Sequence, residues 1–322
     1  LYQTLLRREK ELQVLANSRG NNVRLVERAT VPNAPFSPNL RRAVMLGTIV
    51  AFLVAIGLVL GLDYLDDTIK TPEDIARLGL PFLALIPAAR AGRHRPTLSG
   101  QNDFSEAIRS LRTSIALSTR QGGSIVLVTS AQPLEGKTTT ACNLAAALAY
   151  GGAKVLLIDA DMRRPGVHRN FGLDNQCGLS ELLSGQAHLT QAVVRLAEPD
   201  LWVMPAGATP PNPSELLASG RMEALLGQVQ NGPFDWVILD TPPVLAVTDA
   251  SILTQWVSGV AFVVGSEMTR RRLAERAVET LATGRPRILG AVLNRVDVSR
   301  NRYYYARHYG YGTRYLAAES VP

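Results

Sequence analysis

The stretch from Ser124 to Tyr150 decides the fold and reads SIVLVTSAQPLEGKTTTACNLAAALAY. The apolar run 125–128 predicts a buried strand, and the Ala- and Leu-rich run 137–150 predicts a helix. Between them, residues 131–138 have the pattern AxxxxGKT, a phosphate-binding loop in which alanine replaces the usual first glycine. The pattern therefore lies between a strand and a helix, which is the context that such a loop requires.

Each position of this loop has a physical role toward a nucleoside triphosphate. Backbone N–H groups at a helix start have no intrahelical partner, and the helix dipole favours negative charge there. Lys137 adds a positive charge near the β and γ phosphates, and the Thr138 hydroxyl is placed to bind Mg²⁺. Gly136 leaves room for the backbone to approach the phosphates. The alternative is a Gly-Lys turn that caps an ordinary helix.

The chain after Ser124 alternates apolar runs with amphipathic segments. Near-continuous apolar strands with helices between them indicate an α/β fold, with a mostly parallel sheet covered by helices on both faces. Ligands of such sheets bind at the carboxyl ends of the strands. Strands are predicted at 124–129, 154–159, 200–204, 234–239, 259–264 and 287–293, with helices between them such as 137–150 and 269–283.

Two acidic motifs come at the ends of predicted strands, within 155–165 and 237–243. Mg²⁺ prefers oxygen ligands and keeps several waters, so Asp240 and Asp161 suffice to hold it beside phosphates. Asp159 directly follows its strand and fits a base that accepts a proton from an attacking hydroxyl. The alternative is that strand-terminal aspartates cap the helices that follow them.

Two groups of charged residues each have two interpretations. Glu106, Arg109 and Arg112 lie three residues apart on one stripe of a predicted helix. Such stripes are solvated faces with weak ion pairs, or they dock on a neighbouring subunit. Arg163 and Arg164 fit either a phosphate or a neighbouring subunit.

The segment from Ala43 to Leu62 holds twenty consecutive residues without a charge. A helix rises about 1.5 Å per residue, so this one spans roughly 30 Å, the thickness of a bilayer's hydrocarbon core. A buried helix of this length normally has a polar face, and this one has none. We therefore predict one transmembrane helix at 42–63.

The charges beside this helix conflict with the location expected for the following domain. Arg41 and Arg42 precede it and acids follow it, so the positive-inside rule puts the N-terminal side in the cytoplasm. The nucleotide site that follows needs ATP, and charges near one span do not always decide topology. We expect the C-terminal side to be cytoplasmic, with the basic residues of 90–95 near the anionic leaflet or in a solvated linker.

The segments around this helix have simpler patterns. Residues 1–20 predict a polar helix, as the end of a coiled coil or as a solvated stub, and the prolines of 32–38 indicate a stiff spacer. The chain begins at Leu1, which favours a fragment or a processed product. The stretch Thr71-Pro72-Glu73-Asp74 predicts a helix start, with a capping residue, then proline, then acids in the first turn. Further predictions are a helix end near Gly79, a strand at 81–87, a linker at 88–101 and a helix at 104–118 with Ile108, Leu111 and Ile115 on its apolar face.

The composition bounds the class of protein and its partners. The 322 residues carry a net charge of +7, which suits nucleic acid or an anionic membrane surface. The two cysteines, Cys142 and Cys177, lack metal-type spacing, which argues against a disulfide scaffold and a zinc site. A reduced cytosolic core is the simplest interpretation.

The C-terminal segment is rich in tyrosine and arginine. Its position and its glycines predict a flexible tail. Three interpretations are open. The segment binds single-stranded nucleic acid, it forms a buried strand, which the glycines disfavour, or its tyrosine hydroxyls are the nucleophiles of a phosphate-transferring site. Six of the nine tyrosines lie here: Tyr303, Tyr304, Tyr305, Tyr309, Tyr311 and Tyr315.

Together these motifs resemble the bacterial tyrosine autokinases (BY-kinases) of capsule and exopolysaccharide export. The resemblance rests on the proline-rich spacer and membrane helix, three nucleotide motifs (131–138, 155–163 and 237–242), PPNPSELL at 210–217 and the tyrosine-rich end. It implies a P-loop NTPase-like fold and makes the Glu106–Arg112 stripe a ring-assembly motif. One departure is Leu134, where many members have glycine, and it should change the flexibility of the loop.

The resemblance implies nucleotide, magnesium and catalytic roles for the residues already named. Catalytic positions are Lys137, Asp159, Asp161 and Asp240; nucleotide-binding positions are Ala131, Glu135, Gly136, Lys137, Thr138, Thr139 and Arg163; magnesium positions are Thr138, Asp161 and Asp240; and the six tail tyrosines are phosphate acceptors. The implied domains are the end of a periplasmic chain-length-determining region (1–41), a transmembrane helix (42–63), a cytoplasmic linker (64–102), a kinase domain (103–298) and the tail (299–322).

The function expected from this resemblance is ATP- and Mg²⁺-dependent transfer of a phosphoryl group to tail tyrosines of a neighbouring subunit. This transfer would control ring assembly and polysaccharide export at the bacterial inner membrane. Expected partners are further copies of the chain, the export machinery and a tyrosine phosphatase, but not nucleic acid. The alternatives are a membrane-tethered ATPase switch and a non-enzymatic polysaccharide co-polymerase.

Overall fold

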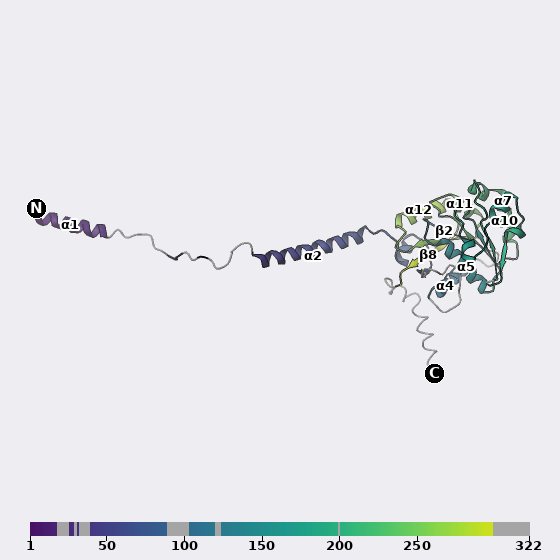
Figure 1. The fold of residues 1–322 in the computed structure, drawn as a ribbon, viewed down its shortest axis with the longest axis horizontal. Helices are drawn as coiled ribbons and strands as arrows, with labels where there is room; N and C mark the ends of the chain where they lie inside the picture. Colours follow the sequence, from purple (N-terminus) through teal and green to yellow (C-terminus); the bar gives the residue numbers. More distant parts are fainter. Residues whose placement is uncertain are drawn as a thin grey trace, which may run out of the picture. The chain divides into compact units, whose positions relative to one another are not determined.

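The computed structural model describes residues 1–17, 26–28, 31, 39–88, 103–119, 124–198 and 200–298. The chain divides into two units, Leu1–Leu65 and a second that starts at Asp66. The first unit holds α1 (Tyr2–Asn17) and α2 (Leu40–Leu65) (Figure 1). Of the helices in these ranges, α2 is the one long and apolar enough to cross a membrane, and none of its apolar window is buried. Both helices agree with the sequence predictions.

The second unit is built on an eight-stranded sheet in the order β1-β8-β7-β2-β6-β3-β5-β4. Neighbouring strands are parallel except β4, which runs antiparallel to β5 at one edge. All six strands predicted from Ser124 onward are confirmed, and β4 was missed because it is short and mostly exposed. The strands are β1 (Phe82–Pro87), β2 (Ser124–Ser130), β3 (Val155–Asp159), β4 (Val194–Leu196), β5 (Leu201–Met204), β6 (Trp236–Asp240), β7 (Gly259–Gly265) and β8 (Ile288–Val296).

Helices cover both faces of this sheet, as predicted, and each face has its own apolar core (Figure 1). One core contains the fully buried Ile108, Leu111 and Ile115, which confirms the predicted apolar face of α4. That face carries α4 (Asp103–Ser118), α5 (Lys137–Tyr150) and α6 (Val167–Phe171). The other carries α3 (Pro72–Arg77), α7 (Leu179–Ser184), α8 (Leu189–Ala192), α9 (Pro213–Leu217), α10 (Gly220–Gln230), α11 (Asp249–Leu253), the 3₁₀ helix η1 (Thr254–Trp256) and α12 (Arg271–Ala282).

The segment 66–88 corrects the domain boundary expected after residue 102. Its strand β1 pairs with β8, so it is an edge strand of the sheet and not part of a separate linker. Upstream of β1, the Ile69 N–H donates to the Thr269 carbonyl at 2.9 Å, and Thr68 forms an antiparallel bridge with Arg270. The α/β unit therefore starts at Asp66, directly after α2.

Helix α3 begins as its sequence predicted. The Thr71 side chain accepts from the Asp74 N–H, and the Asp74 carboxylate accepts from the Thr71 N–H. The same carboxylate pairs with Arg271 at 3.0 Å, which ties the cap to the start of α12. The capping box thus fixes the start of α3, and the ion pair joins it to α12.

Candidate nucleotide-binding site

The loop 131–136 connects β2 to α5 at the carboxyl edge of the sheet. Two of its residues have left-handed backbone, Leu134 with φ 70° and Gly136 with φ 91°. A Cβ on Gly136 would collide with the side-chain amide of Asn294, so only glycine fits there. Leu134 takes a left-handed conformation that favours glycine. Its side chain is 79% exposed and packs little.

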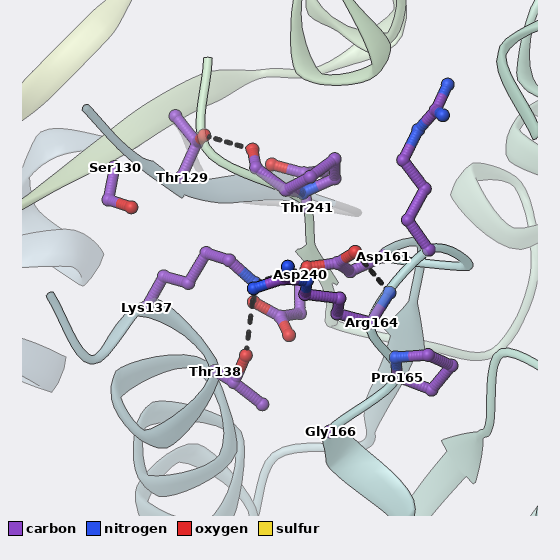
Figure 2. A network of polar contacts seen from close by, with 12 residues as sticks. Thr129, Ser130, Lys137, Thr138, Asp161, Arg164, Pro165, Gly166, Asp240 and Thr241 are labelled. Atoms are coloured by element: carbon purple, nitrogen blue, oxygen red, sulfur yellow. Dashed lines mark hydrogen bonds and ion pairs between the residues drawn. The ribbon is translucent and has the colours of Figure 1, made fainter. Parts of the chain in front are cut away.

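Lys137, the first residue of α5, turns its ammonium into a group of carboxylates (Figure 2). The Nζ donates to Asp161 Oδ2 at 2.7 Å and to the Thr138 hydroxyl oxygen at 3.2 Å, and it lies 3.8 Å from Asp240 Oδ1. Burial by itself lowers the pKa of Lys137, but the charges of Asp240 and Asp161 outweigh it and raise this pKa above its ordinary value. The lysine therefore remains charged inside the site.

Asp240 ends β6 and is fully buried. Neither of its carboxylate oxygens has a hydrogen-bond partner among the described residues. Burial raises the pKa of this carboxyl to about 6, although the charge of Lys137 and the nearby Thr138 hydroxyl oppose that shift. A buried carboxylate with no donor is costly unless a cation satisfies it, so this side chain fits a magnesium ligand or a ligand of magnesium-bound water.

Asp159 ends β3 and is buried beside Asp240. Its Oδ2 accepts from the N–H groups of Gly166 and Val167 at 3.0 Å each, and its Oδ1 accepts from the Asp161 N–H at 3.2 Å. Burial and the neighbouring charge of Asp240 raise its pKa to about 7. The residue thus fastens the loop after β3 to the start of α6, as the capping alternative expected, and its pKa also suits proton transfer near neutral pH.

The described residues contain no cluster of three or more acidic, histidine or cysteine side chains that would hold a metal alone. Mg²⁺ is usually held by one or two carboxylates together with the phosphates of a nucleotide. Asp161, Asp240 and the Thr138 hydroxyl converge around Lys137 and supply such a partial set (Figure 2). The residues predicted for magnesium therefore lie together and fit the ion.

Three other residues were predicted to bind the nucleotide, Glu135, Thr139 and Ala131. Glu135 turns its carboxylate into the protein, where it accepts from the Gln132 N–H at 2.8 Å and from the Thr269 hydroxyl. Burial raises its pKa above the ordinary value. Thr139 is exposed and Ala131 is buried. The Glu135 carboxylate therefore braces the loop, while nucleotide roles for Thr139 and Ala131 stay predictions.

Arg163 is engaged within the chain. Its Nε donates to Asp249 Oδ2 at 2.9 Å and its Nη2 donates to the Ser214 hydroxyl at 2.8 Å. The hydrogen bond that Arg163 donates to the Asp249 carboxylate is the main cause of a raised pKa for this guanidinium. Ser214 belongs to the PPNPSELL stretch at 210–217. This stretch therefore packs against the nucleotide motif around Arg163. Arg164 is exposed, and its backbone N–H donates to Asp161 Oδ1 at 3.0 Å (Figure 2).

Three residues that brace the loop were not predicted. Thr269 bonds the Glu135 carboxylate, Asn294 donates to the Glu135 carbonyl at 2.8 Å, and Arg295 donates to the Leu134 carbonyl at 2.8 Å. They follow or end β7 and β8, more than 130 residues after the loop. The rule that ligands bind at strand ends pointed to this region, but no local pattern marked these side chains.

The three charged residues of the stripe on α4 do not share the same partners. Glu106 and Arg109 pair with each other at 2.9 Å on the surface. Arg112 instead donates to the Ala147 carbonyl at 3.2 Å, in the last turn of α5. The six tail tyrosines, the basic residues of 90–95 and the spacer prolines lie outside the described residues.

Comparisons with known proteins find two family models in this chain. Residues 125–264 match an AAA domain, and residues 1–63 match a G-rich domain on putative tyrosine kinases. The tyrosine-protein kinase YwqD of Bacillus subtilis is 45% identical over 202 residues, which are 62% of this chain and 84% of YwqD. The solved kinase domain of the Escherichia coli tyrosine kinase ETK is 34% identical, with a TM-score of 0.66, covering 71% of this chain and 95% of the domain. This chain belongs to the bacterial tyrosine kinases.

The match to these kinases confirms the predicted family and its P-loop α/β fold. The full-length relative etk of Escherichia coli K12 is 33% identical over 320 residues, which are 92% of this chain and 44% of that protein. The chain thus spans less than half the length of the long curated kinases that it matches. The apolar helix α2 and the G-rich family model together indicate association with the inner membrane.

Proposed function

We propose that this chain is an ATP-dependent protein-tyrosine kinase that phosphorylates tyrosines of its own C-terminal segment on a neighbouring subunit. The observation that carries the proposal is Asp240, a buried carboxylate without a donor, 3.8 Å from the Lys137 ammonium at the start of α5. Such an arrangement suits a magnesium-bound triphosphate, and the relatives are named tyrosine kinases. The tail holds six of the nine tyrosines of the chain, which we take as the acceptor hydroxyls.

In the proposed reaction, a tyrosyl oxygen forms a bond to the γ-phosphorus while the bond from that phosphorus to the β–γ bridging oxygen breaks. ADP leaves, and the phenolic proton passes to Asp159, whose pKa of about 7 allows it to accept a proton near neutral pH. Lys137 and the loop N–H groups stabilise the charge on the phosphoryl oxygens. Asp161, Asp240 and the Thr138 hydroxyl would hold Mg²⁺, which would supply positive charge to offset the charge that develops on the phosphates.

The location and assembly follow from the same proposal. The α/β unit needs cytoplasmic ATP, so the residues before α2 would be periplasmic. Each phosphate adds about −1.5 to −2 charge to a basic tail, which would weaken contacts between subunits. Phosphorylation and a phosphatase would then cycle a ring between assembled and dispersed states and tune polysaccharide export.

Mass spectrometry of the C-terminal peptide after incubation with Mg·ATP tests the kinase assignment. Wild-type protein should carry phosphotyrosine, Lys137→Met should carry none, and Lys154→Met should equal wild type. Lys154 is a matched control because it is exposed just before β3, at the opposite edge of the sheet. Full phosphorylation of Lys137→Met would refute the catalytic assignment. ATP hydrolysis without phosphotyrosine would favour the ATPase switch.

A second variant tests the acceptors separately. Replacing all six tail tyrosines by phenylalanine should remove the phosphotyrosine signal while ATP binding stays intact. If the signal persists in that variant, the acceptors lie elsewhere and the tail assignment fails.

A further inference from the structure

The phosphate loop contains a carboxylate that no nucleotide role explains. Glu135 is 1% exposed, although it lies in the loop and precedes Gly136. Its Oε2 accepts from the Gln132 N–H at 2.8 Å, which closes the loop on itself. Its Oε1 accepts from the hydroxyl of Thr269, which lies in the connection between β7 and α12. This second contact links the loop to a part of the chain 134 residues away.

Thr269 is itself held on several sides. It is fully buried, and its N–H donates to the Gly265 carbonyl at 3.0 Å. Its carbonyl accepts from the Ile69 N–H at 2.9 Å. The Gly265 N–H donates to the Thr269 hydroxyl oxygen at 3.0 Å, which leaves the single hydroxyl proton for the Glu135 carboxylate. The donor is therefore fixed in place and in direction before any ligand arrives.

The loop needs such a constraint because its backbone is unfavourable. Leu134 has φ 70°, a conformation that costs free energy for any residue except glycine. The exposed Leu134 side chain makes little contact that would offset this cost. Without an anchor beside it, the loop would relax to other conformations, and its N–H groups would no longer point at one anion.

We propose that Thr269 is a positioning residue for the phosphate loop: its hydroxyl holds Glu135 and thereby keeps the loop N–H groups in their phosphate-binding arrangement. The inference rests on the proposed nucleotide site and extends it to a residue outside the nucleotide motifs. Thr269 makes no hydrogen bond to Asp161, Asp240 or Lys137, so the link from its hydroxyl to the phosphate loop runs through Glu135. Its removal should weaken binding of the triphosphate without removing a ligand.

The test compares three variants of the whole chain in detergent micelles. Thr269→Val removes the hydroxyl and keeps the shape, while Thr269→Ser keeps the hydroxyl. Thr254→Val is the matched control, because Thr254 is also buried and donates to the Ser251 carbonyl. Thr254 precedes β7, whereas Thr269 follows it, so the two lie at opposite edges of the sheet. Isothermal titration measures the Kd for Mg·ATP, and thermal unfolding without nucleotide measures stability.

We expect Thr269→Val to raise the Kd for Mg·ATP about tenfold, as loss of a hydrogen bond to a buried charge predicts. Thr269→Ser should bind like wild type. Thr254→Val should lower the unfolding midpoint comparably but leave the Kd unchanged. Wild-type affinity in Thr269→Val would overturn the inference, and so would an equal loss of affinity in Thr254→Val. Absence of Mg·ATP binding in the wild type would instead overturn the proposed function, and the inference with it.

Discussion

The ammonium of Lys137 lies 2.7 Å from Asp161 Oδ2, in a site where both side chains are almost buried. A divalent ion held by Asp161 and Asp240 would lie close to this positively charged ammonium. Like charges repel strongly at such a distance in a poorly solvated site. Binding of Mg·ATP should therefore move the ammonium from the carboxylates toward the phosphates, and Asp161 should exchange a lysine for the metal.

Asp161→Asn tests this exchange. The amide keeps the size of the side chain but is a weak ligand for Mg²⁺, so the Mg²⁺ concentration for half-maximal ATP binding should rise about tenfold. Titration of Mg²⁺ at fixed ATP, followed by the fluorescence of a labelled nucleotide, measures it. Asp235→Asn is the control, because Asp235 is exposed and lies just before β6, at the opposite edge of the sheet. An unchanged Mg²⁺ requirement in Asp161→Asn would exclude a metal role for this residue.

Asp240 predicts a pH dependence of stability in the nucleotide-free protein. Its folded pKa is about 6, above the ordinary value of 3.8, so the folded state holds more protons than the unfolded state between these values. The contribution of Asp240 to stability is therefore largest below pH 4 and falls as the pH rises to about 6. Above that range the ionised, buried carboxylate costs about 1–3 kcal/mol.

Asp240→Asn removes this titration. Without nucleotide or Mg²⁺, the variant should be more stable than wild type at pH 7.5, and this difference should shrink toward pH 5. Urea unfolding of both proteins at the two pH values gives the four free energies that are needed. Comparing variant with wild type at each pH cancels the titrating groups that do not interact with Asp240. A difference that grows as the pH falls would contradict the predicted sign.

Two substitutions at Leu134 should differ in their effect on stability. Leu134→Gly relieves the left-handed strain but makes the unfolded chain more flexible, so the free energy of unfolding should change by less than about 1 kcal/mol. Leu134→Val places a β-branched residue at φ 70° and should cost about 1–2 kcal/mol. Chemical unfolding of both variants checks this. Equal stability of the two would mean that the loop changes its backbone to suit the residue.

Substitutions at Arg112 and Glu106 should distinguish effects on the stability of the domain from effects on ring assembly. Arg112 donates to a carbonyl at the C-terminus of α5, so Arg112→Ala should destabilise the domain by about 1 kcal/mol. Glu106 is in an exposed ion pair, so Glu106→Gln should change stability by less than about 1 kcal/mol.

Glu106→Gln is therefore the cleaner test of the proposed ring contact. Native mass spectrometry of the detergent-solubilised chain should detect fewer subunits in its complexes than in those of wild type. If the complexes keep the size of wild type, Glu106 has no part in assembly.

The strands and the phosphate loop were predictable because their signals are local. A buried parallel strand needs a continuous apolar run, and the loop needs a fixed spacing of glycine, lysine and threonine before a helix. Strand β4 and the place of β1 in the sheet were not predictable in this way. The first is a short, exposed edge strand, and the second is defined by its pairing with β8, about 200 residues later in the chain.

By itself the sequence determined that an anion-binding loop and two strand-terminal acids exist, and that one apolar helix precedes them. Only the tertiary structure decided which of these groups meet, because the strand order places β2 and β3 on either side of β6. That order brings Lys137 to Asp161 and Asp240, while packing turns Glu135 inward onto Thr269. Local patterns follow from backbone periodicity, whereas these contacts depend on crossovers between distant segments, which no local pattern records.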